Sequence, residues 1–419
     1  MNSRERIVCA INHQFPDKLP IDFGGTLTTG IHVSMIYRLR QYYSLDKPNT
    51  PVKVIEPYQM LGEIKDDLKK IIGIDTVSLQ GSKNIFGFEN ENWKEWRLWD
   101  GTPVLVPEKF NTEKEKDGYI YMYPQGDKNY LPSAKMPEKG YYFDSIMRQK
   151  KIDDSNLNIE DNLEEFSLID DNELKYIKKE AESLYDNTEY SIIASLVQSS
   201  FGDVAFVPGP ALKDPKGIRD ITEWYVSVAT RKEYIKNVFE KQCEIALENY
   251  KKIQQSIGNL IDIVFVTGAD FGVQNGLLIS KELYREMFKP YHKSINDWIH
   301  ENTKWKTFIH SCGAVYELIP DFIEAGFDIL NPVQISAKDM EPERLKKEFG
   351  KYIVFWGGGV NTQKTLPFGT PEQVREEVKR NIEIFSREGG FVFTTVHNLQ
   401  ANNPIENVVA MIETLKEYR

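Results

Sequence analysis

The chain has 419 residues, of which 41% are hydrophobic and 27% charged, a composition typical of a globular protein with a large core. Its 52 Lys and Arg against 63 Asp and Glu give a net charge of −11, so we expect no nucleic-acid partner, because phosphate binding needs a positive surface. The sequence has no signal-like segment and no apolar run of membrane length, so we expect the chain to be cytoplasmic. Its 3 cysteines do not suggest a disulfide framework.

The first 80 residues alternate between short helices and strands. Apolar residues recur at helical spacing in residues 2–13, and residues 31–43 and 57–72 are also predicted to be helices. Residues 19–23 form a short predicted strand that ends in a glycine turn, and residues 75–79 form a second one.

Residues 82–190 have a different composition, rich in Lys, Asp, Gly and Tyr. A β-hairpin is predicted to turn at Asp100–Gly101, and two acidic helices are predicted near 159–166 and 171–187. We interpret the region as an insertion or subdomain on the main domain. Its role is left open between extra packing surface and a lid or partner-docking element.

From residue 190 onward, short apolar strands alternate with helices of nine or more residues, which is typical of parallel βα units. The strands are 191–196, 262–267, 307–310, 328–331, 352–356 and 390–394; the helices are 231–257, 280–301, 315–325, 341–349, 371–388 and 404–418. With the two earlier strands they make eight. We therefore predict an α/β chain in which residues 1–419 form one (β/α)₈ TIM-type barrel with an N-terminal extension. The alternative is a doubly wound open sheet, which normally carries a Gly-rich phosphate loop that is missing here.

Polar residues follow the carboxyl end of five consecutive predicted strands, where barrel enzymes place their active sites. His310 and Cys312 are two residues apart and would point to the same side of an extended strand. His397 leaves a strand two units later. Two imidazoles and a thiolate suit Zn²⁺ with a fourth position open. The alternative is a packed histidine beside a small buried cysteine.

Other polar residues at the same strand ends are candidates for substrate contacts. Asp270 is a candidate fourth ligand, base or general acid, or else a turn residue. The glycine run around Gly358 would allow close approach of a substrate or of packed chain. The candidate amides for orienting or binding the substrate are Gln274, Asn331, Gln334 and Asn361.

Several of these segments together resemble the uroporphyrinogen decarboxylase superfamily, closely over 190–419 and more loosely over 1–80. The segments are His310–Gly313, Asn331–Gln334, Gly357–Gln363, Gly369–Val374 and His397–Gln400. They are most similar to its branch of zinc-dependent, corrinoid-protein methyltransferases and O-demethylases. The resemblance implies a (β/α)₈ barrel, a zinc ion and a corrinoid (cobalamin) cofactor supplied by a partner protein.

Two departures from the family pattern bear on the reaction. The decarboxylases carry an N-terminal arginine motif, whereas residues 20–26 here contain no arginine, which argues against tetrapyrrole decarboxylation. The methyltransferases use a second cysteine where this chain has His397, which leaves the metal set and the substrate open. Two histidines and one cysteine leave a more positive zinc, which favours cleavage of a methyl–oxygen bond.

The resulting hypothesis is a zinc-dependent methyltransferase that moves a methyl group from a small methylated, O-methyl compound to a corrinoid protein. One alternative is a lyase, such as a decarboxylase of another small acid or of a tetrapyrrole. The other is a barrel that binds a corrinoid or tetrapyrrole without turning it over. Whether the chain forms a homodimer is left open.

Overall fold

The centre of the computed structural model, which describes residues 1–197 and 199–419, is a seven-stranded parallel sheet in the order β16-β15-β14-β13-β10-β9-β3. Each strand pairs in parallel with its neighbour, and His310 at the end of β13 lies opposite Asn331 at the end of β14. The strands are β3 (Thr76–Gln80), β9 (Ser191–Ser195), β10 (Ile263–Thr267), β13 (Lys306–His310), β14 (Ile329–Asn331), β15 (Val354–Trp356) and β16 (Phe391–Val392).

The segment around Ile21 closes this sheet into a barrel. Ile21 forms a parallel bridge with Phe393, just beyond β16, and its carbonyl accepts the backbone N–H of Asp75, just before β3, at 2.8 Å. Seven of the eight predicted strands are therefore present, whereas the predicted strand 19–23 is reduced to the single bridge at Ile21. Because this bridge connects the two edges of the sheet, the prediction of a (β/α)₈ barrel is confirmed rather than the open sheet.

Alternate strand residues fill the inside of the barrel. The interior cluster includes Ile193, Ile263, Phe308 and Trp356, whereas the intervening residues pack outward against the helices. Helix α1 (Ser3–Ile11), begun by a capping box at Asn2, adds Ile7, Ala10 and Ile11 to the same cluster. The N-terminal helix therefore closes the amino-end of the barrel, and only the carboxyl ends of the strands are left for a site.

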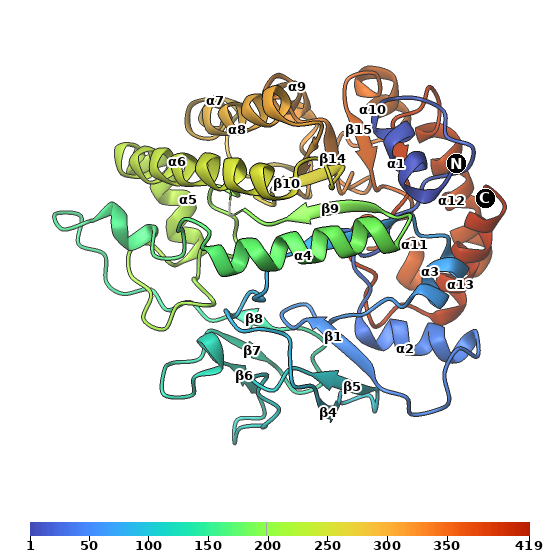
Figure 1. Ribbon diagram of the computed structural model, residues 1–419, viewed down its shortest axis with the longest axis horizontal. Coiled ribbons are helices and arrows are strands. Elements are labelled where there is room, and N and C mark those ends of the chain that lie inside the picture. The colour runs from blue at the N-terminus through green and yellow to red at the C-terminus, as the bar shows by residue number, and fades with distance from the viewer. Residues whose placement is uncertain (198) are drawn as a thin grey trace.

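Helices surround the barrel (Figure 1), and the two termini lie near each other on one side. The predicted helix 280–301 is two helices that meet at Phe288. Of the predicted helix 57–72, only the last turns are helical, because Leu61–Gly62 pairs with the strand β1 (Val52–Glu56). The helices are α2 (Val33–Tyr42), α3 (Asp66–Ile72), α4 (Asp171–Asn187), α5 (Ile221–Thr230), α6 (Lys232–Ile257), α7 (Lys281–Met287), α8 (Lys289–Asn302), α9 (Ile319–Glu324), α10 (Pro342–Phe349), α11 (Thr365–Phe368), α12 (Pro371–Phe385) and α13 (Ile405–Lys416). Within the described ranges, no helix combines the length and apolarity needed to cross a membrane.

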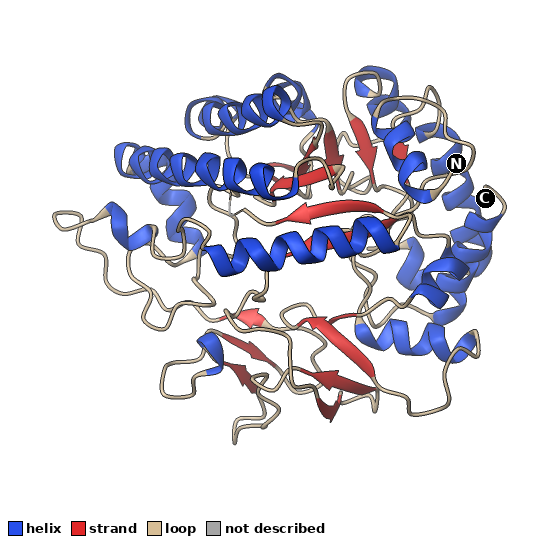
Figure 2. Cartoon of the chain, viewed as in Figure 1, coloured by secondary structure: helices blue, strands red, loops and turns tan. Residues whose placement is uncertain are grey.

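Two small sheets form a separate layer beside the barrel (Figure 2). The predicted hairpin is present, with β4 and β5 antiparallel and Gly101 at φ +86° in the turn. The segment near 159–166 contains only a short 3₁₀ turn, Ile159–Asn162, while α4 packs against the barrel. The strands of this layer are β1 (Val52–Glu56), β2 (Leu61–Gly62), β4 (Lys94–Arg97), β5 (Pro103–Val106), β6 (Ile120–Met122), β7 (Ala134–Met136) and β8 (Asp144–Ser145).

Candidate metal centre

Three potential metal ligands meet at the carboxyl end of the barrel. His310 is the last residue of β13 and has the same inward parity as Phe308, Cys312 follows two residues later, and His397 lies in the loop after β16. One donor atom from each lies within 4.8 Å of the other two, and the Sγ of Cys312 is 3.4 Å from Nε2 of His310. The barrel thus brings together donors that are 87 residues apart in sequence, from 310 to 397.

Asn331 holds the ring of His310. Nδ1 of the histidine donates to Oδ1 of Asn331 at 2.6 Å, and Nδ2 of Asn331 donates to the carbonyl of Trp356 at 2.7 Å. The proton is therefore on Nδ1, and Nε2 offers its lone pair toward Cys312. Burial lowers the pKa of His310 to about 4, which keeps this lone pair available at neutral pH. Asn331 contacts the histidine, so the geometry favours a positioning role for this residue.

His397 has a different hydrogen-bonding pattern. Its Nδ1 accepts the backbone N–H of Asn398 at 2.8 Å, so the neutral ring carries its proton on Nε2. Burial, together with the neighbouring His310, lowers its pKa to about 4. If Nε2 of His397 binds an ion, the ring must release the bond from Asn398. His310 and Cys312 are therefore the pre-set part of the donor group.

Asp270 supports the cysteine from the neighbouring strand. Its Oδ1 accepts the backbone N–H of Cys312 at 2.7 Å, and it is not part of the three-residue donor group. Burial raises the pKa of Asp270, and burial, followed by the charge of Asp270, raises the pKa of the Cys312 thiol well above its usual range. A bound cation would offset both effects, since it stabilises a thiolate and a carboxylate together.

Asp203 is a site residue that the sequence reasoning missed. It lies in the loop after β9, is 8% exposed, and its Oδ1 accepts the backbone N–H of Ala205 at 2.9 Å. Burial, with a smaller contribution from the charge of Asp270, raises its pKa to about 7. The available signal was similar to that for Asp270, because an acidic residue within two positions of a glycine follows each of the two strands.

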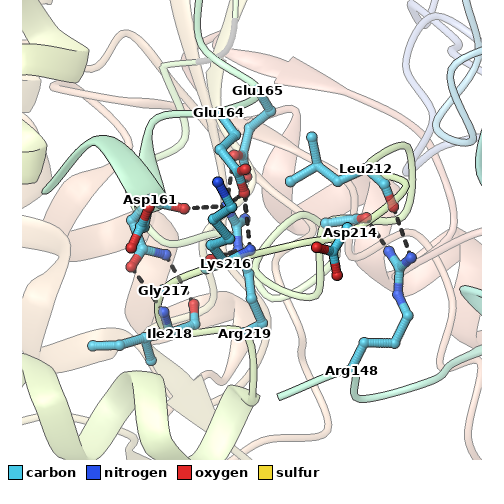
Figure 3. Close-up of polar contacts among 12 residues, drawn as sticks. Arg148, Asp161, Glu164, Glu165, Leu212, Asp214, Lys216, Gly217, Ile218 and Arg219 are labelled. Atoms are coloured by element: carbon cyan, nitrogen blue, oxygen red, sulfur yellow. Dashed lines mark hydrogen bonds and ion pairs between the residues drawn. The ribbon is translucent and has the colours of Figure 1, made fainter. Parts of the chain in front are cut away.

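Two arginines hold the loop that carries Asp203 (Figure 3). Arg148 donates to the carbonyls of Leu212, at 2.7 Å, and Gly209. Arg219, 1% exposed, donates from Nη1 to Glu165 at 2.7 Å and from Nε to the carbonyl of Lys216 at 2.6 Å. Residues 146–165 and the β9–α5 loop are therefore joined by buried charged groups, which fixes the far half of that loop.

The predicted substrate amides Gln274 and Gln334 are bonded to the protein. Nε2 of Gln334 donates to Oε1 of Gln274 at 3.0 Å, and Oε1 of Gln334 accepts the N–H of Gly313 at 2.9 Å. Nε2 of Gln274 in turn donates to the carbonyl of Ser336. These bonds tie the loops after β10, β13 and β14 to one another and so shape the rim of the mouth.

Asn361 and Gly358 also have local structural partners. Oδ1 of Asn361 accepts the backbone N–H groups of Gln363 and Lys364 just before α11. A Cβ added to Gly358, at φ +71°, would lie 3.1 Å from the carbonyl oxygen of Val333. The glycine run thus allows two loops to pack closely, and the packing interpretation is favoured over substrate contact.

The comparisons with known proteins agree with this architecture. Residues 215–418 match the family described as Uroporphyrinogen decarboxylase (URO-D), and this range contains all three candidate ligands. No curated protein matches the chain.

Among solved structures, a methyltransferase from Methanosarcina mazei is similar over 100% of this chain and 99% of its own, with a TM-score of 0.54 and 14% identity. A B12-independent methionine synthase from Shewanella sp. W3-18-1, in complex with selenomethionine, is 11% identical over 88% of this chain and 98% of its own, with a TM-score of 0.32. The first likeness shows a shared fold. The family match makes residues 215–418 of this chain similar to the uroporphyrinogen decarboxylase family.

Proposed function

We propose that this protein is a zinc-dependent methyltransferase that moves a methyl group from a small O-methyl compound to a corrinoid protein. The observation that carries the proposal is the group of His310, Cys312 and His397 at the open end of the barrel. The sequence similarity to corrinoid-dependent methyltransferases, and the fold shared with a solved methyltransferase, support the reaction class.

The donor group fits zinc in kind and in spacing. Zinc–nitrogen and zinc–sulfur bonds of about 2.1 and 2.3 Å place tetrahedral ligands roughly 3.3–3.8 Å apart. The Sγ of Cys312 and Nε2 of His310 are 3.4 Å apart, and all three donor atoms lie within 4.8 Å of one another, so only a small movement would be needed to bind one ion. Three protein ligands leave one position for the substrate, as in catalytic zinc sites.

The ligand set favours an oxygen-linked methyl group. A zinc ion held here would supply Lewis acidity to the atom that carries the methyl group. Cys312 contributes one negative charge and the histidines none, so the formal charge of the site is about +1, which suits withdrawal of electrons from an ether oxygen. Asp270 uses Oδ1 to hold the Cys312 backbone, which leaves the fourth position to substrate.

The methyl acceptor in this proposal is a corrinoid held by a separate protein. Helix α1 fills the amino end of the barrel, so the approach of a second protein is expected at the carboxyl end, where the candidate ligands lie. The bonded pair Gln274 and Gln334 would form part of the rim that the partner meets.

Metal analysis tests the site directly. Purified protein is expected to contain about one zinc per chain, and Cys312→Ala and His397→Ala should each lose most of it, because three ligands are the minimum for a catalytic site. Cys243→Ala is the matched control, since this cysteine is free as well but lies on α6 and is not one of the candidate ligands. Full zinc content in both ligand variants would show that the site is wrongly assigned.

A paired assay tests the reaction. With a cob(I)alamin protein as acceptor, methyl ethers are expected to methylate the cobalt, visible as a change in its absorption spectrum. Thiols offered with the methylated corrinoid are the control for the opposite specificity. Efficient thiol methylation without ether demethylation, or turnover of the ether without any corrinoid, contradicts the proposal.

A further inference from the structure

We propose that Asp203 is a further catalytic residue, the acid that gives a proton to the oxygen leaving from the methyl donor. The inference rests on the proposed function, because it concerns the proton that ether cleavage requires. It goes beyond the metal centre in naming a residue in the loop after β9, a strand whose end supplies no ligand.

The position of Asp203 follows from the order of the strands. β9, β10 and β13 are neighbours in the sheet, and their carboxyl-end loops carry Asp203, Asp270 and Cys312 respectively. Asp270 accepts the backbone N–H of Cys312, and the negative charge of Asp270 raises the pKa of Asp203. The three groups therefore follow one another around the mouth, with Asp203 one strand further from the ligands than Asp270.

Only one of the two carboxyl oxygens of Asp203 accepts a hydrogen bond from the described residues. Oδ1 accepts the N–H of Ala205, whereas Oδ2 has no hydrogen-bond partner and no ion pair among the described residues. A Cβ added to Gly268 would lie 2.7 Å from Oδ2, so only glycine at the end of β10 lets the carboxyl lie there. A buried carboxyl beside another carboxylate, without a cation, is best accommodated as the neutral acid with its proton on the free oxygen.

The groups around Asp203 preserve this state. Asp270 faces it from the β10 loop, and Tyr225 on α5 donates its hydroxyl to the backbone carbonyl of Asp270 at 3.0 Å. Neither group is a cation. The loop itself is held by Arg148 and Arg219, which donate to the loop carbonyls of Gly209, Leu212 and Lys216. Among the described residues, neither arginine forms an ion pair with Asp203.

The proton completes the reaction. In R–O–CH₃ the carbon–oxygen bond breaks and a carbon–cobalt bond forms with the electron pair of the cob(I)alamin co-substrate. The pair of the broken bond stays on oxygen, which takes the proton from Oδ2 of Asp203 and leaves as R–OH. The Asp203 carboxylate then regains a proton from water, so each turnover consumes one proton from solvent.

The test uses the zinc-containing protein with two donors of different leaving groups. Asp203→Asn is expected to slow demethylation of anisole by about 100-fold or more, the range of general-acid catalysis. It should slow 4-nitroanisole, whose phenolate leaves without an acid, by less than about 5-fold. Zinc content should stay at that of the wild type. Asp297→Asn, an exposed change on α8, is the control and should alter neither rate.

A second readout does not need activity. Metal-free wild-type protein at pH 6 should show the infrared carbonyl band of a buried, protonated carboxyl, and Asp203→Asn should lack it. If Asp203→Asn does not fold, the wild type alone decides, because its preference for 4-nitroanisole over anisole should grow as pH rises through about 7. Equal slowing of both donors, or an unchanged band, overturns the role of Asp203. Absence of methyl transfer in the wild type instead overturns the proposed function.

Discussion

The carboxylates at the two ends of the barrel differ in whether they have cationic partners. At the closed end, beside α1, Asp75 is fully buried and accepts hydrogen bonds from Arg6 at 2.6 Å, Arg419 at 2.5 Å and the backbone N–H of Ile21 at 3.0 Å. At the open end, Asp203 is buried and Asp270 is half-buried, close enough for the charge of Asp270 to raise the pKa of Asp203, and among the described residues neither forms an ion pair with Lys or Arg.

The difference separates structural from functional charge. Asp75 joins helix α1, through Arg6, to the segment after α13, through Arg419. Removing one partner of such a group leaves the others buried and unpaired, which is costly. The carboxyls of the open end, when ionised, instead destabilise the folded protein. Such destabilisation is typical of residues that take part in catalysis. The same substitution should therefore have opposite effects at the two ends.

The largest effect is expected at the closed end. Asp75→Asn keeps the shape but leaves two arginines facing a neutral amide, and should lower the free energy of unfolding by about 3–5 kcal/mol. Asp297→Asn, which removes an exposed partner of Lys293, should change it by less than about 0.5 kcal/mol. Denaturant unfolding measures both. Equal effects of the two variants would contradict the comparison, whereas zinc content should be normal in both.

At the open end, Asp203→Asn should stabilise the metal-free protein at pH 8. The pKa of Asp203 is raised from 3.8 to about 7, so the folded protein binds an extra proton between these values and wild-type stability falls as pH rises from about 4 to 7. The shift of about three units corresponds to at most about 4 kcal/mol. The gain of the variant should be complete above pH 7 and vanish below pH 4. A gain independent of pH would mean that desolvation of the carboxylate is not the cause.

The barrel was predictable from sequence because its strands are short apolar runs between long amphipathic helices, a local signal. The break of the predicted helix 280–301 at Phe288 was not, although Pro290 lacks the N–H that a continuous helix would use. The helix predicted for residues 57–72 begins only after Lys65. The residues before it are not helical because Leu61–Gly62 pairs with β1, and no local sequence pattern shows this pairing.

The candidate ligands were also predictable, since His310 and Cys312 are neighbours in sequence and few histidines compete. The hydrogen bonds of the residues around these ligands were not predictable from the sequence. Gln274 and Gln334 look alike as amides at strand ends, yet they bond to each other across two loops. Asp203 was overlooked because its proximity to Asp270 depends on which strands are adjacent in the closed sheet.

The smallest effect is expected from Thr28, which contacts Asn331 at the margin of the candidate metal centre. Its hydroxyl donates to Oδ1 of Asn331 at 3.3 Å, a long bond to an oxygen that already accepts Nδ1 of His310 at 2.6 Å. Thr28→Val should therefore lower zinc affinity by less than about 3-fold, whereas Asn331→Ala, which frees the His310 ring, should lower it by about 10–100-fold. Competition with a chelator measures both affinities. If Thr28→Val lowered zinc affinity as much as Asn331→Ala does, the orientation of the His310 ring would depend on Thr28 as much as on Asn331. The long hydrogen bond from Thr28 would then contribute as much to the site as the short one between His310 and Asn331.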